Sequence, residues 1–372
     1  MTTYMTNIFM QQHLQNIGIA ATVAGTLIGA LSLASMVFRP FSGWICDRFI
    51  KKKVLLAFTI ITGGCLAGYG LAVSAPVILV LRTLHGIAFG MTTTAIMAYV
   101  SKYIPSERLS EGMGCFALGQ SIATAIGPSI GLYIFKQFGD SWTFYFTAFL
   151  SAGCCVLIMM LPMSAENGNK TPLPLRQQLH FGNFFAKEAI MYAILTVAIA
   201  ATNGIEVSYI ASYAQSLGIE NAGWYFTLSA CTLFVSRALL GKITDRIGFR
   251  YIFFIAVALL CIAFLMLGYA NQNNIVAILA ISSVIKALGM GAVQPGLQAM
   301  CMRAVNAERR GAASGTYYIG ADLGNGLSTV IGGRIVAVHG YSGLFSWMVF
   351  PLLISAGIYT VALLRKYRRE DK

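Results

Sequence analysis

The chain has 372 residues, of which 57% are hydrophobic and only 10% are charged. Soluble domains carry about 25% charged residues, so this composition excludes an ordinary water-soluble globule. The formal net charge of +13 is typical of some nucleic-acid-binding proteins, but the placement of the basic residues excludes that interpretation and predicts no nucleic acid partner.

Long apolar blocks recur along the whole chain. A helix needs about 20 apolar residues to cross a bilayer, and about eleven segments of that length stand between short polar breaks. Examples are residues 21–38, 54–71, 142–163, 190–200, 251–268 and 344–364. A soluble core would not repeat with this period. We therefore predict an all-α integral membrane protein with about eleven complete transmembrane helices embedded in the lipid bilayer.

The two halves of the sequence repeat one another at an offset of about 200 residues. One run aligns Arg39, Gly43, Asp47 and Arg48 with Arg237, Gly241, Asp245 and Arg246. A second run aligns Glu107, Arg108, Gly114, Gly119 and Gly131 with Glu308, Arg309, Gly315, Gly320 and Gly332. A polar, Pro- and Asn-containing stretch separates the halves. We therefore predict an N-terminal helix bundle at residues 1–162, a cytoplasmic linker at residues 163–187 and a C-terminal helix bundle at residues 188–372.

The first span is short in this register. The seventh span covers about residues 184–212, and Gly18 aligns with Gly218. Shifting back by about 200 residues leaves only the end of the first span, residues 4–12, within the chain. About nine residues cannot cross a bilayer as a helix. We expect the first transmembrane helix to be truncated, or its start codon to be assigned too late; the alternative is a first span that is simply short.

Residues 39–53 read RPFSGWICDRFIKKK. This segment resembles the first motif of the major facilitator superfamily, GxxxDRxG followed by basic residues, which joins the second and third spans. Ile50 replaces the second glycine of the motif, whereas the second copy, GKITDRIGFR at residues 241–250, retains it. The resemblance implies the major facilitator fold, with two pseudo-symmetric six-helix bundles.

The same resemblance implies a cytoplasmic latch between the bundles. Its residues are Gly43, Asp47, Arg48, Gly241, Asp245 and Arg246. Glycine lets two helices approach closely, and an aspartate at the membrane surface can accept hydrogen bonds from a helix N-terminus, whose dipole favours an anion. The alternative is a basic loop without a latch.

Residues 82–86, RTLHG, resemble a further motif of the superfamily that is linked to proton coupling. A charged side chain at the centre of the bilayer costs about 2.5–3.5 kcal/mol. We therefore expect Arg82, with His85 beside it, to face protein or water. The alternative places Arg82 near the extracellular end of the fourth span, where its side chain reaches the surface.

The fifth span contains small residues at every fourth position, which lets helices pack closely. Residues 127–131, GPSIG, resemble the motif characteristic of antiporters in the superfamily, with Leu132 in place of its last glycine. The antiporter-like residues are Gly119, Gly127, Pro128 and Gly131. Proline permits a bend. The alternative is a stripe that serves packing alone.

Three further ionisable residues interrupt apolar spans: Glu206, Lys286 and Asp322. Carboxylates buried in a helix bundle can exchange protons as water access changes sides, so Asp322 is our first candidate for a proton or cation site and Glu206 the second. Gln120, Asn203 and Asn325 complete the predicted substrate and proton pathway, with Arg82, His85 and Lys286. The alternative is a structural ion pair, such as Asp322 with Lys286, which could itself be the coupling element.

Basic residues concentrate in one set of loops if successive spans alternate sides. That set, with the C-terminal tail, includes Arg48, Lys51, Lys52, Lys53, Lys102, Arg108, Lys170, Arg176, Lys242, Arg246, Arg250, Arg303, Arg309, Arg310, Arg365, Lys366, Arg368 and Arg369. The opposite loops hold little more than Lys136. By the positive-inside rule we expect a multi-pass protein of the plasma membrane with its C-terminus in the cytoplasm.

The motifs together predict a secondary transporter. The chain lacks a Walker motif, its cysteines lack metal-ligand spacing, and no cluster of catalytic residues stands at a membrane face. We therefore expect no cofactor, no bound metal and no enzyme activity. The resemblance to drug/proton antiporters implies a monomer that exports small organic molecules in exchange for protons. The alternatives are an importer or uniporter of a small polar solute, such as a sugar or organic acid, or a truncated inactive product.

Overall fold

The computed structural model describes residues 21–162, 185–219 and 223–370, together with residues 2, 5, 6, 10, 13, 14 and 16–19. Most of the predicted linker and most of the predicted first-helix fragment therefore lie outside the described residues. Within the described ranges the chain forms helices and short connections, with no strand. The all-α prediction is confirmed, as expected where a bilayer forces every backbone group to bond within its own segment.

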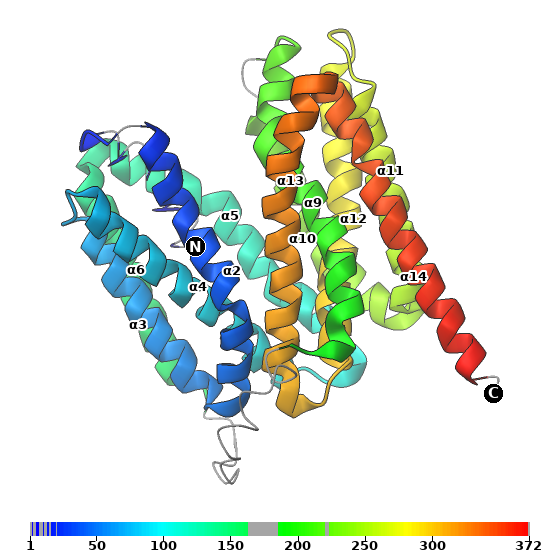
Figure 1. Ribbon diagram of the computed structural model, residues 1–372, viewed down its shortest axis with the longest axis horizontal. Coiled ribbons are helices and arrows are strands. Elements are labelled where there is room, and N and C mark those ends of the chain that lie inside the picture. Colours follow the sequence, from blue (N-terminus) through cyan, green and yellow to red (C-terminus); the bar gives the residue numbers. More distant parts are fainter. Residues whose placement is uncertain are drawn as a thin grey trace. The chain divides into compact units, whose positions relative to one another are not determined.

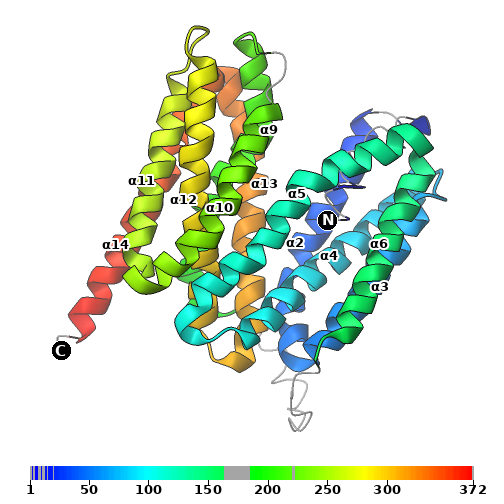
Figure 2. The ribbon, with the colours of Figure 1, turned by 180° about the vertical axis from the view of Figure 1, so that it is seen from behind.

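The helices follow the apolar blocks of the sequence (Figures 1 and 2). The first half forms α2 (Ala21–Arg48), α3 (Lys51–Tyr69), α4 (Ala75–Tyr103), the short helix η1 (Ser106–Arg108), α5 (Leu109–Phe138) and α6 (Asp140–Met160). The second half forms η2 (Lys187–Ala189), α9 (Ile190–Ser216), α10 (Gly223–Ile247), α11 (Phe249–Gly268), α12 (Ile275–Arg303), η3 (Ala307–Arg309), α13 (Arg310–Trp347) and α14 (Val349–Glu370).

Among the described residues, eight helical stretches are long and apolar enough to cross a membrane. The number becomes nine if the two parts of α10, which meet at an angle of 45°, count as one span. The longest stretch, Ala307–Arg365, includes both α13 and α14. The chain is therefore a multi-pass helical membrane protein. The predicted total of about eleven spans counts α13 and α14 as separate spans and also includes α5, which is not among these stretches.

Contacts divide the chain into two units. Unit 1 comprises Met1–Tyr103, Ile122–Lys187 and Val305–Tyr318, and unit 2 comprises Ile104–Ser121, Glu188–Ala304 and Ile319–Lys372. Each unit thus combines most of one half of the sequence with a short segment from the other half. The first part of α13 belongs to unit 1, and the first part of α5 belongs to unit 2.

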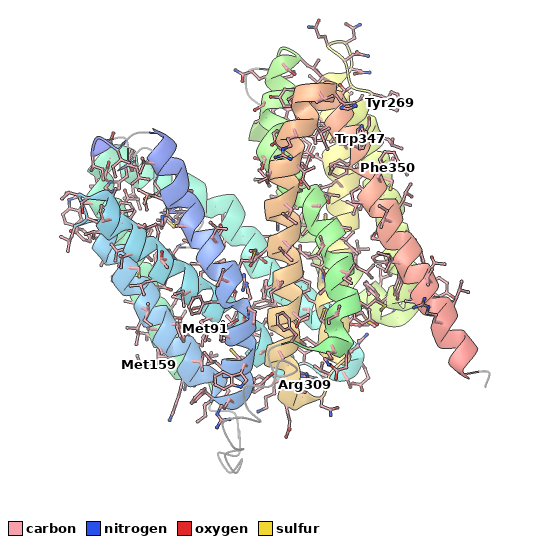
Figure 3. The ribbon with its side chains drawn as sticks, in the orientation of Figure 1. Met91, Met159, Tyr269, Arg309, Trp347 and Phe350 are labelled. Carbon is pink, nitrogen blue, oxygen red and sulfur yellow. The ribbon has the colours of Figure 1, made fainter. Side chains whose placement is uncertain are left out.

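Within unit 1, α4 packs against both α2 and α3, and α3 packs against α6 (Figures 1 and 2). A buried apolar cluster fills the space between these helices and includes Cys46, Leu55 and Met91, the last of which is labelled in Figure 3. Burial between two neighbours lets α4 carry polar side chains away from lipid.

Within unit 2, α12 packs against α10 and α11 and also contacts α9. Helix α14 contacts α9 and α11. At the turn between α13 and α14, the rings of Trp347 and Phe350 lie 5.4 Å apart (Figure 3). Helix α12 holds the central place in unit 2 that α4 holds in unit 1, and the sequence repeat aligns these two helices.

The repeat extends to the backbone turns. Gly18 and Gly218 have φ angles of 81° and 91°, and Gly139 and Gly340 have φ angles of 85° and 69°. Residues with a Cβ rarely adopt such values. Each pair is separated by about 200 residues, the offset of the sequence repeat, so the same left-handed turn recurs at equivalent places in both halves.

Candidate transport site and helix seams

Asp47, near the end of α2, binds the N-terminus of α13. The backbone N–H groups of Gly311 and Ala312 donate to its Oδ1 and Oδ2 atoms, at 2.5 and 2.8 Å. Gly311 and Ala312 are the second and third residues of α13, whose N–H groups have no acceptor within their own helix. The carboxylate therefore caps α13 from another helix, where the helix dipole favours a negative charge.

Asp245, near the end of α10, makes the same contact with α5. The backbone N–H groups of Ser110 and Glu111 donate to its Oδ1 and Oδ2 atoms, at 3.2 and 2.8 Å. These are again the second and third residues of the helix. Each copy of the sequence motif thus contacts the N-terminus of a helix from the other half of the chain. We call these contacts the α2–α13 seam and the α10–α5 seam.

A glycine precedes each aspartate by one helical turn and allows the close approach. A Cβ on Gly43 would lie 2.9 Å from both the Ala312 Cα and the Gly311 carbonyl oxygen. A Cβ on Gly241 would lie 2.9 Å from the Ser110 carbonyl oxygen. Both distances are shorter than real Cβ contacts, so any larger residue would push the helices apart.

The arginines of the two Asp-Arg pairs, Arg48 and Arg246, are exposed. The guanidinium of Arg48 lies 5.9 Å from the centroid of the Trp44 ring on its own helix. The aspartate of the second seam instead meets Arg303 of α12, whose Nη2 lies 2.8 Å from Asp245 Oδ1. The aspartates and glycines of the motif are therefore the residues that form the two seams.

A buried charge contact inside unit 2 joins Glu206 of α9 to Lys286 of α12. The Lys286 ammonium donates to Glu206 Oε2, and the two residues are only 7% and 1% exposed. The sequence offered Asp322 as an example of a structural partner for Lys286, whereas the folded chain places Glu206 there. Removing one member of a buried ion pair leaves an uncompensated charge, so the two residues depend on each other.

A second polar contact in unit 2 joins the predicted pathway residues Asn203 and Asn325. The Asn203 side-chain amide donates to Asn325 Oδ1 at 3.2 Å between α9 and α13. Asp322 lies one helical turn before Asn325 and is half-buried, so both occupy nearly the same face of α13. The predicted pathway residues of α9, α12 and α13 therefore all belong to unit 2. Gln120, on α5, is exposed.

The predicted residues Arg82 and His85 form a buried cluster in unit 1 with Tyr69 of α3. The Arg82 guanidinium lies 5.4 Å from the centroid of the Tyr69 ring, and the Tyr69 hydroxyl is 3.2 Å from His85 Nδ1. Arg82 and His85 are both 0% exposed. Arg82 therefore faces the protein interior, and the alternative in which it reaches the membrane surface is wrong.

The antiporter-like residues of α5 divide between two environments. Gly127 and Gly131 are buried. Gly119 is exposed, and a Cβ added there would meet no atom within 4 Å. The side chain of Pro128 lies outside the described residues. Gly119 therefore has no close neighbour among the residues that the structure describes.

Helix α13 carries the equivalent stripe and packs it against α9. A Cβ on Gly320 would collide with the Ala193 carbonyl oxygen, and a Cβ on Gly324 would collide with the Val197 carbonyl oxygen. These close approaches bring Asn203 and Asn325 within hydrogen-bonding distance. In this pair of helices the small residues position polar side chains, as small-residue stripes do in other membrane helix pairs.

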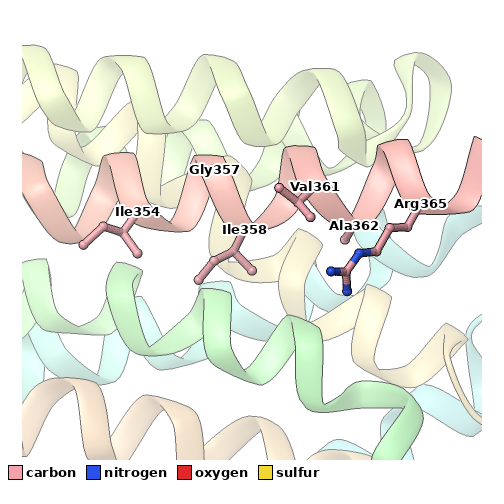
Figure 4. A pocket seen from close by; sticks show the side chains of 6 residues that line it. All are labelled: Ile354, Gly357, Ile358, Val361, Ala362 and Arg365. Atoms are coloured by element: carbon pink, nitrogen blue, oxygen red, sulfur yellow. The ribbon is translucent and has the colours of Figure 1, made fainter.

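Two hollows stand apart from the predicted pathway. The larger, of about 440 Å³, is lined by Ile354, Gly357, Ile358, Val361, Ala362 and Arg365 of α14 (Figure 4). The smaller, of about 170 Å³, is lined by residues of α13 and its C-terminal turn, including Arg334 and Trp347. Neither hollow is lined by any of the predicted pathway residues. The lining of the first is almost entirely apolar, as expected of a surface that faces lipid.

Sequence reasoning did not propose a role for three buried residues that contact neighbouring helices: Tyr69, Arg39 and Arg237. The two arginines were visible as charges inside apolar segments at equivalent repeat positions, which is the signal that identifies functional charges in membrane helices. Tyr69 gave no comparable signal, because an aromatic residue near the end of a span is ordinary. Its proximity to Arg82 and His85 emerges only when α3 packs on α4.

Comparison with known proteins places the chain among transporters. A sequence model of the Major Facilitator Superfamily matches residues 1–221 and, in a second match, residues 189–372. Similar proteins include the staphylopine export protein of Staphylococcus aureus strain Mu50, 25% identical over 350 residues that cover 92% of this chain and 86% of that protein. The multidrug resistance protein MdtG of Serratia proteamaculans is 23% identical over 364 residues, covering 94% and 87%.

Solved structures share the fold at low sequence identity. The human organic anion transporter MFSD10 superposes with a TM-score of 0.77 at 16% identity, covering 95% of this chain and 88% of that one. A bacterial homologue of the iron transporter ferroportin, in an outward-facing state, superposes with a TM-score of 0.71 at 13% identity and covers 96% and 95%. Both likenesses support the predicted arrangement of helices.

Proposed function

The chain belongs to the major facilitator superfamily, and from that premise we propose that it exports small organic molecules in exchange for protons. The single observation that supports coupling to protons is the buried ion pair between Glu206 and Lys286. A carboxylate and an ammonium at this depth are costly to hold in a membrane protein. We infer that they are retained because the pair opens and closes as a proton or a substrate arrives.

Asp322 and the amide pair of Asn203 and Asn325 support a polar pathway beside this ion pair. Asp322 is half-buried on α13, the helix that also carries Asn325. A half-buried carboxylate is reached by water more readily than Glu206, which is almost fully buried. We therefore propose that Asp322 exchanges protons with water and that Glu206 and Lys286 respond to its charge.

Export rather than import is supported by the relatives, two of which are named for staphylopine export and for multidrug resistance. We propose a monomer in the plasma membrane with a cytoplasmic C-terminus, which the basic loops and tail favour. In this proposal the bundles at residues 1–162 and 188–372 alternate access to the two sides. The seams at Asp47 and Asp245 would then act as the latch that the sequence motif implied.

The proposal is tested by measuring proton movement caused by substrate. A panel of organic cations, anions and zwitterions is first screened for compounds whose toxicity falls when the chain is expressed in a host lacking its own major exporters. Each such compound is then added to everted membrane vesicles holding an acidic interior, and a pH-sensitive dye reports proton release. Exchange predicts that the compound collapses the pH gradient and accumulates inside the vesicles.

Three variants test which residues are needed for proton release. Asp322→Asn and Glu206→Gln should abolish proton release, because each removes a protonatable group from the pathway. Glu107→Gln is the matched control, since Glu107 stands exposed in η1 outside the spans and its loss should leave exchange intact. Full exchange in both pathway variants would reject proton coupling at this site. A uniporter would ignore the gradient, and a proton-coupled importer would move the compound together with protons.

A further inference from the structure

Arg39 is buried in the second half of α2 and contacts two other helices of unit 1. It is 1% exposed, and its Nη1 atom donates to the Gly90 carbonyl at 3.3 Å and to the Thr93 hydroxyl at 2.5 Å on α4. Its guanidinium also lies 4.4 Å from the centroid of the Tyr318 ring on α13. One side chain therefore joins α2 to a helix of its own half and to a helix of the other half.

Arg237 makes the equivalent contacts on α10 in unit 2. It is 4% exposed and donates to the Ala117 carbonyl at 2.7 Å and to the Ser121 hydroxyl on α5. Its Nη2 atom donates to Gln294 Oε1 on α12 at 2.6 Å. Again one arginine joins its helix to a partner in its own half, α12, and to a partner from the other half, α5.

The backbones beside both arginines are as close as those beside the aspartates. A Cβ on Gly315 would lie 2.9 Å from the Arg39 carbonyl oxygen, and a Cβ on Gly114 would lie 2.8 Å from the Arg237 carbonyl oxygen. Each arginine precedes its seam aspartate by about two helical turns, or about 12 Å at the rise of an α-helix. The two helices of each seam are therefore in contact along the whole segment between the aspartate and the arginine.

We propose that Arg39 and Arg237 are positioning residues that fasten the α2–α13 and α10–α5 seams at a second point. A seam held only by its aspartate could pivot about the helix N-terminus. When the arginine is also bound, the first turns of α13 or α5 are held at two points, the aspartate and the arginine. They then separate from α2 or α10 only when both contacts break. This role lies outside the latch motif and the pathway, and it depends on the proposed transport cycle only in that the seams must part.

The two fastenings differ in chemistry. Arg39 holds α13 by stacking on an aromatic ring, an interaction that survives loss of the ring hydroxyl and fails without the ring. Arg237 holds α5 by hydrogen bonds from Nη1 to a carbonyl and a hydroxyl and holds α12 through Nη2, so its contacts use two nitrogens in the fixed geometry of a guanidinium. Lysine could therefore replace Arg39 in part, whereas it could not reproduce the paired contacts of Arg237.

The test measures opening of the seams without relying on transport. Ser314 on α13 is 0% exposed, and its hydroxyl donates to the Thr94 carbonyl of α4 at 3.2 Å. Met113 on α5, also 0% exposed, aligns with Ser314 in the repeat. In the full-length chain with its native cysteines replaced, Ser314→Cys and Met113→Cys report seam opening through their rate of labelling by a water-soluble maleimide.

Arg39→Gln and Tyr318→Leu should raise labelling of Ser314→Cys by about 2- to 30-fold, the range that loss of a cation–π contact allows. Tyr318→Phe should leave the rate within about 2-fold, because the ring remains. Arg237→Gln should raise labelling of Met113→Cys by a comparable factor, and Arg237→Lys should do the same. Lys242→Gln is the charge-matched control, since Lys242 is exposed on α10, and should leave both rates unchanged.

Unchanged labelling in Arg39→Gln, Tyr318→Leu and Arg237→Gln would overturn the proposal. So would equal effects of Tyr318→Phe and Tyr318→Leu, because the ring would then not be the contact that matters for Arg39. Variants are compared only where size-exclusion elution matches the parent. If Arg39→Gln fails that check, Tyr318→Leu with Tyr318→Phe decides the α2–α13 seam without altering the buried charge.

Discussion

The two units differ most where the repeat aligns His85 with Lys286. In unit 2, Lys286 meets the carboxylate of Glu206, so two opposite charges are buried together. In unit 1, His85 meets the hydroxyl of Tyr69, and the nearby Arg82 stacks on the same ring. The aspartate contacts of the two seams, by contrast, are alike, because each carboxylate accepts from the second and third backbone N–H groups of a helix. The two halves therefore share the aspartate contacts between helices but differ in their buried polar clusters.

The largest expected effect comes from breaking the charge pair of unit 2. Lys286→Met leaves Glu206 as a buried, uncompensated charge, which should lower the free energy of unfolding by about 3–5 kcal/mol. Replacing both residues in Glu206→Leu/Lys286→Met should recover most of this loss, because no charge then remains in the apolar interior. Denaturant unfolding in detergent, followed by tryptophan fluorescence, measures both values.

In unit 1 the buried charge beside His85 is Arg82, which lies over the Tyr69 ring, so Arg82→Met serves as the comparison variant. We expect a loss of only about 0.5–2 kcal/mol, the size of the stacking interaction. Equal losses for Lys286→Met and Arg82→Met would show that the two clusters do not differ in the way their contacts indicate.

An intermediate effect should distinguish two glycines that the repeat aligns, Gly119 and Gly320. A Cβ on Gly320 collides with the Ala193 carbonyl of α9, whereas a Cβ on Gly119 meets nothing within 4 Å. Gly320→Ala should therefore cost about 1–3 kcal/mol, as overpacking does. Gly119→Ala should be neutral or stabilising by up to about 1 kcal/mol, because alanine favours helix.

Thermal unfolding in one detergent compares the two alanine variants directly. A midpoint lowered by Gly320→Ala alone supports the asymmetry between α13 and α5. If both substitutions lowered the midpoint equally, Gly119 would have to be packed against a helix after all.

The smallest expected effect concerns the hydrogen bond of unit 1. Tyr69→Phe removes the hydroxyl that contacts His85 Nδ1 and should cost about 0.6 kcal/mol, the average for such bonds between membrane helices. Tyr225→Phe is a suitable control. Tyr225 is 0% exposed, and within the described residues its hydroxyl has no hydrogen-bond partner, so its loss should cost nothing. Unfolding curves that place Tyr225→Phe below Tyr69→Phe would contradict this ranking.

Much of the fold could be predicted because it depends on local composition. Apolar blocks identified the helices, and the repeated Gly-x-x-x-Asp-Arg pattern identified both ends that form seams. The small-residue stripe of α5 did not indicate that Gly119 has no close neighbour among the described residues. A stripe shows which face of a helix is narrow but not whether a neighbouring helix occupies that face.

The candidate site was predicted as a set of residues, but their pairing was not. Lys286 stands 80 positions from Glu206 in the chain, and nothing local distinguishes Glu206 from Asp322 as its partner. Arg39 and Arg237 were recognised only as marks of the repeat. Their contacts with Tyr318 and Ser121 depend on how α2 and α10 are rotated about their own axes, which a linear pattern specifies only roughly.

The amino-acid sequence was thus sufficient to establish a duplicated, multi-pass helical membrane protein and the ionisable residues within its spans. These features can be predicted from the sequence because charges and unpaired backbone groups are costly in the hydrocarbon region of the bilayer. The partners of the buried charges were decided by tertiary structure alone. An ion pair or a stacked guanidinium requires two helices to meet at one depth and one rotation, and that geometry belongs to the packed bundle.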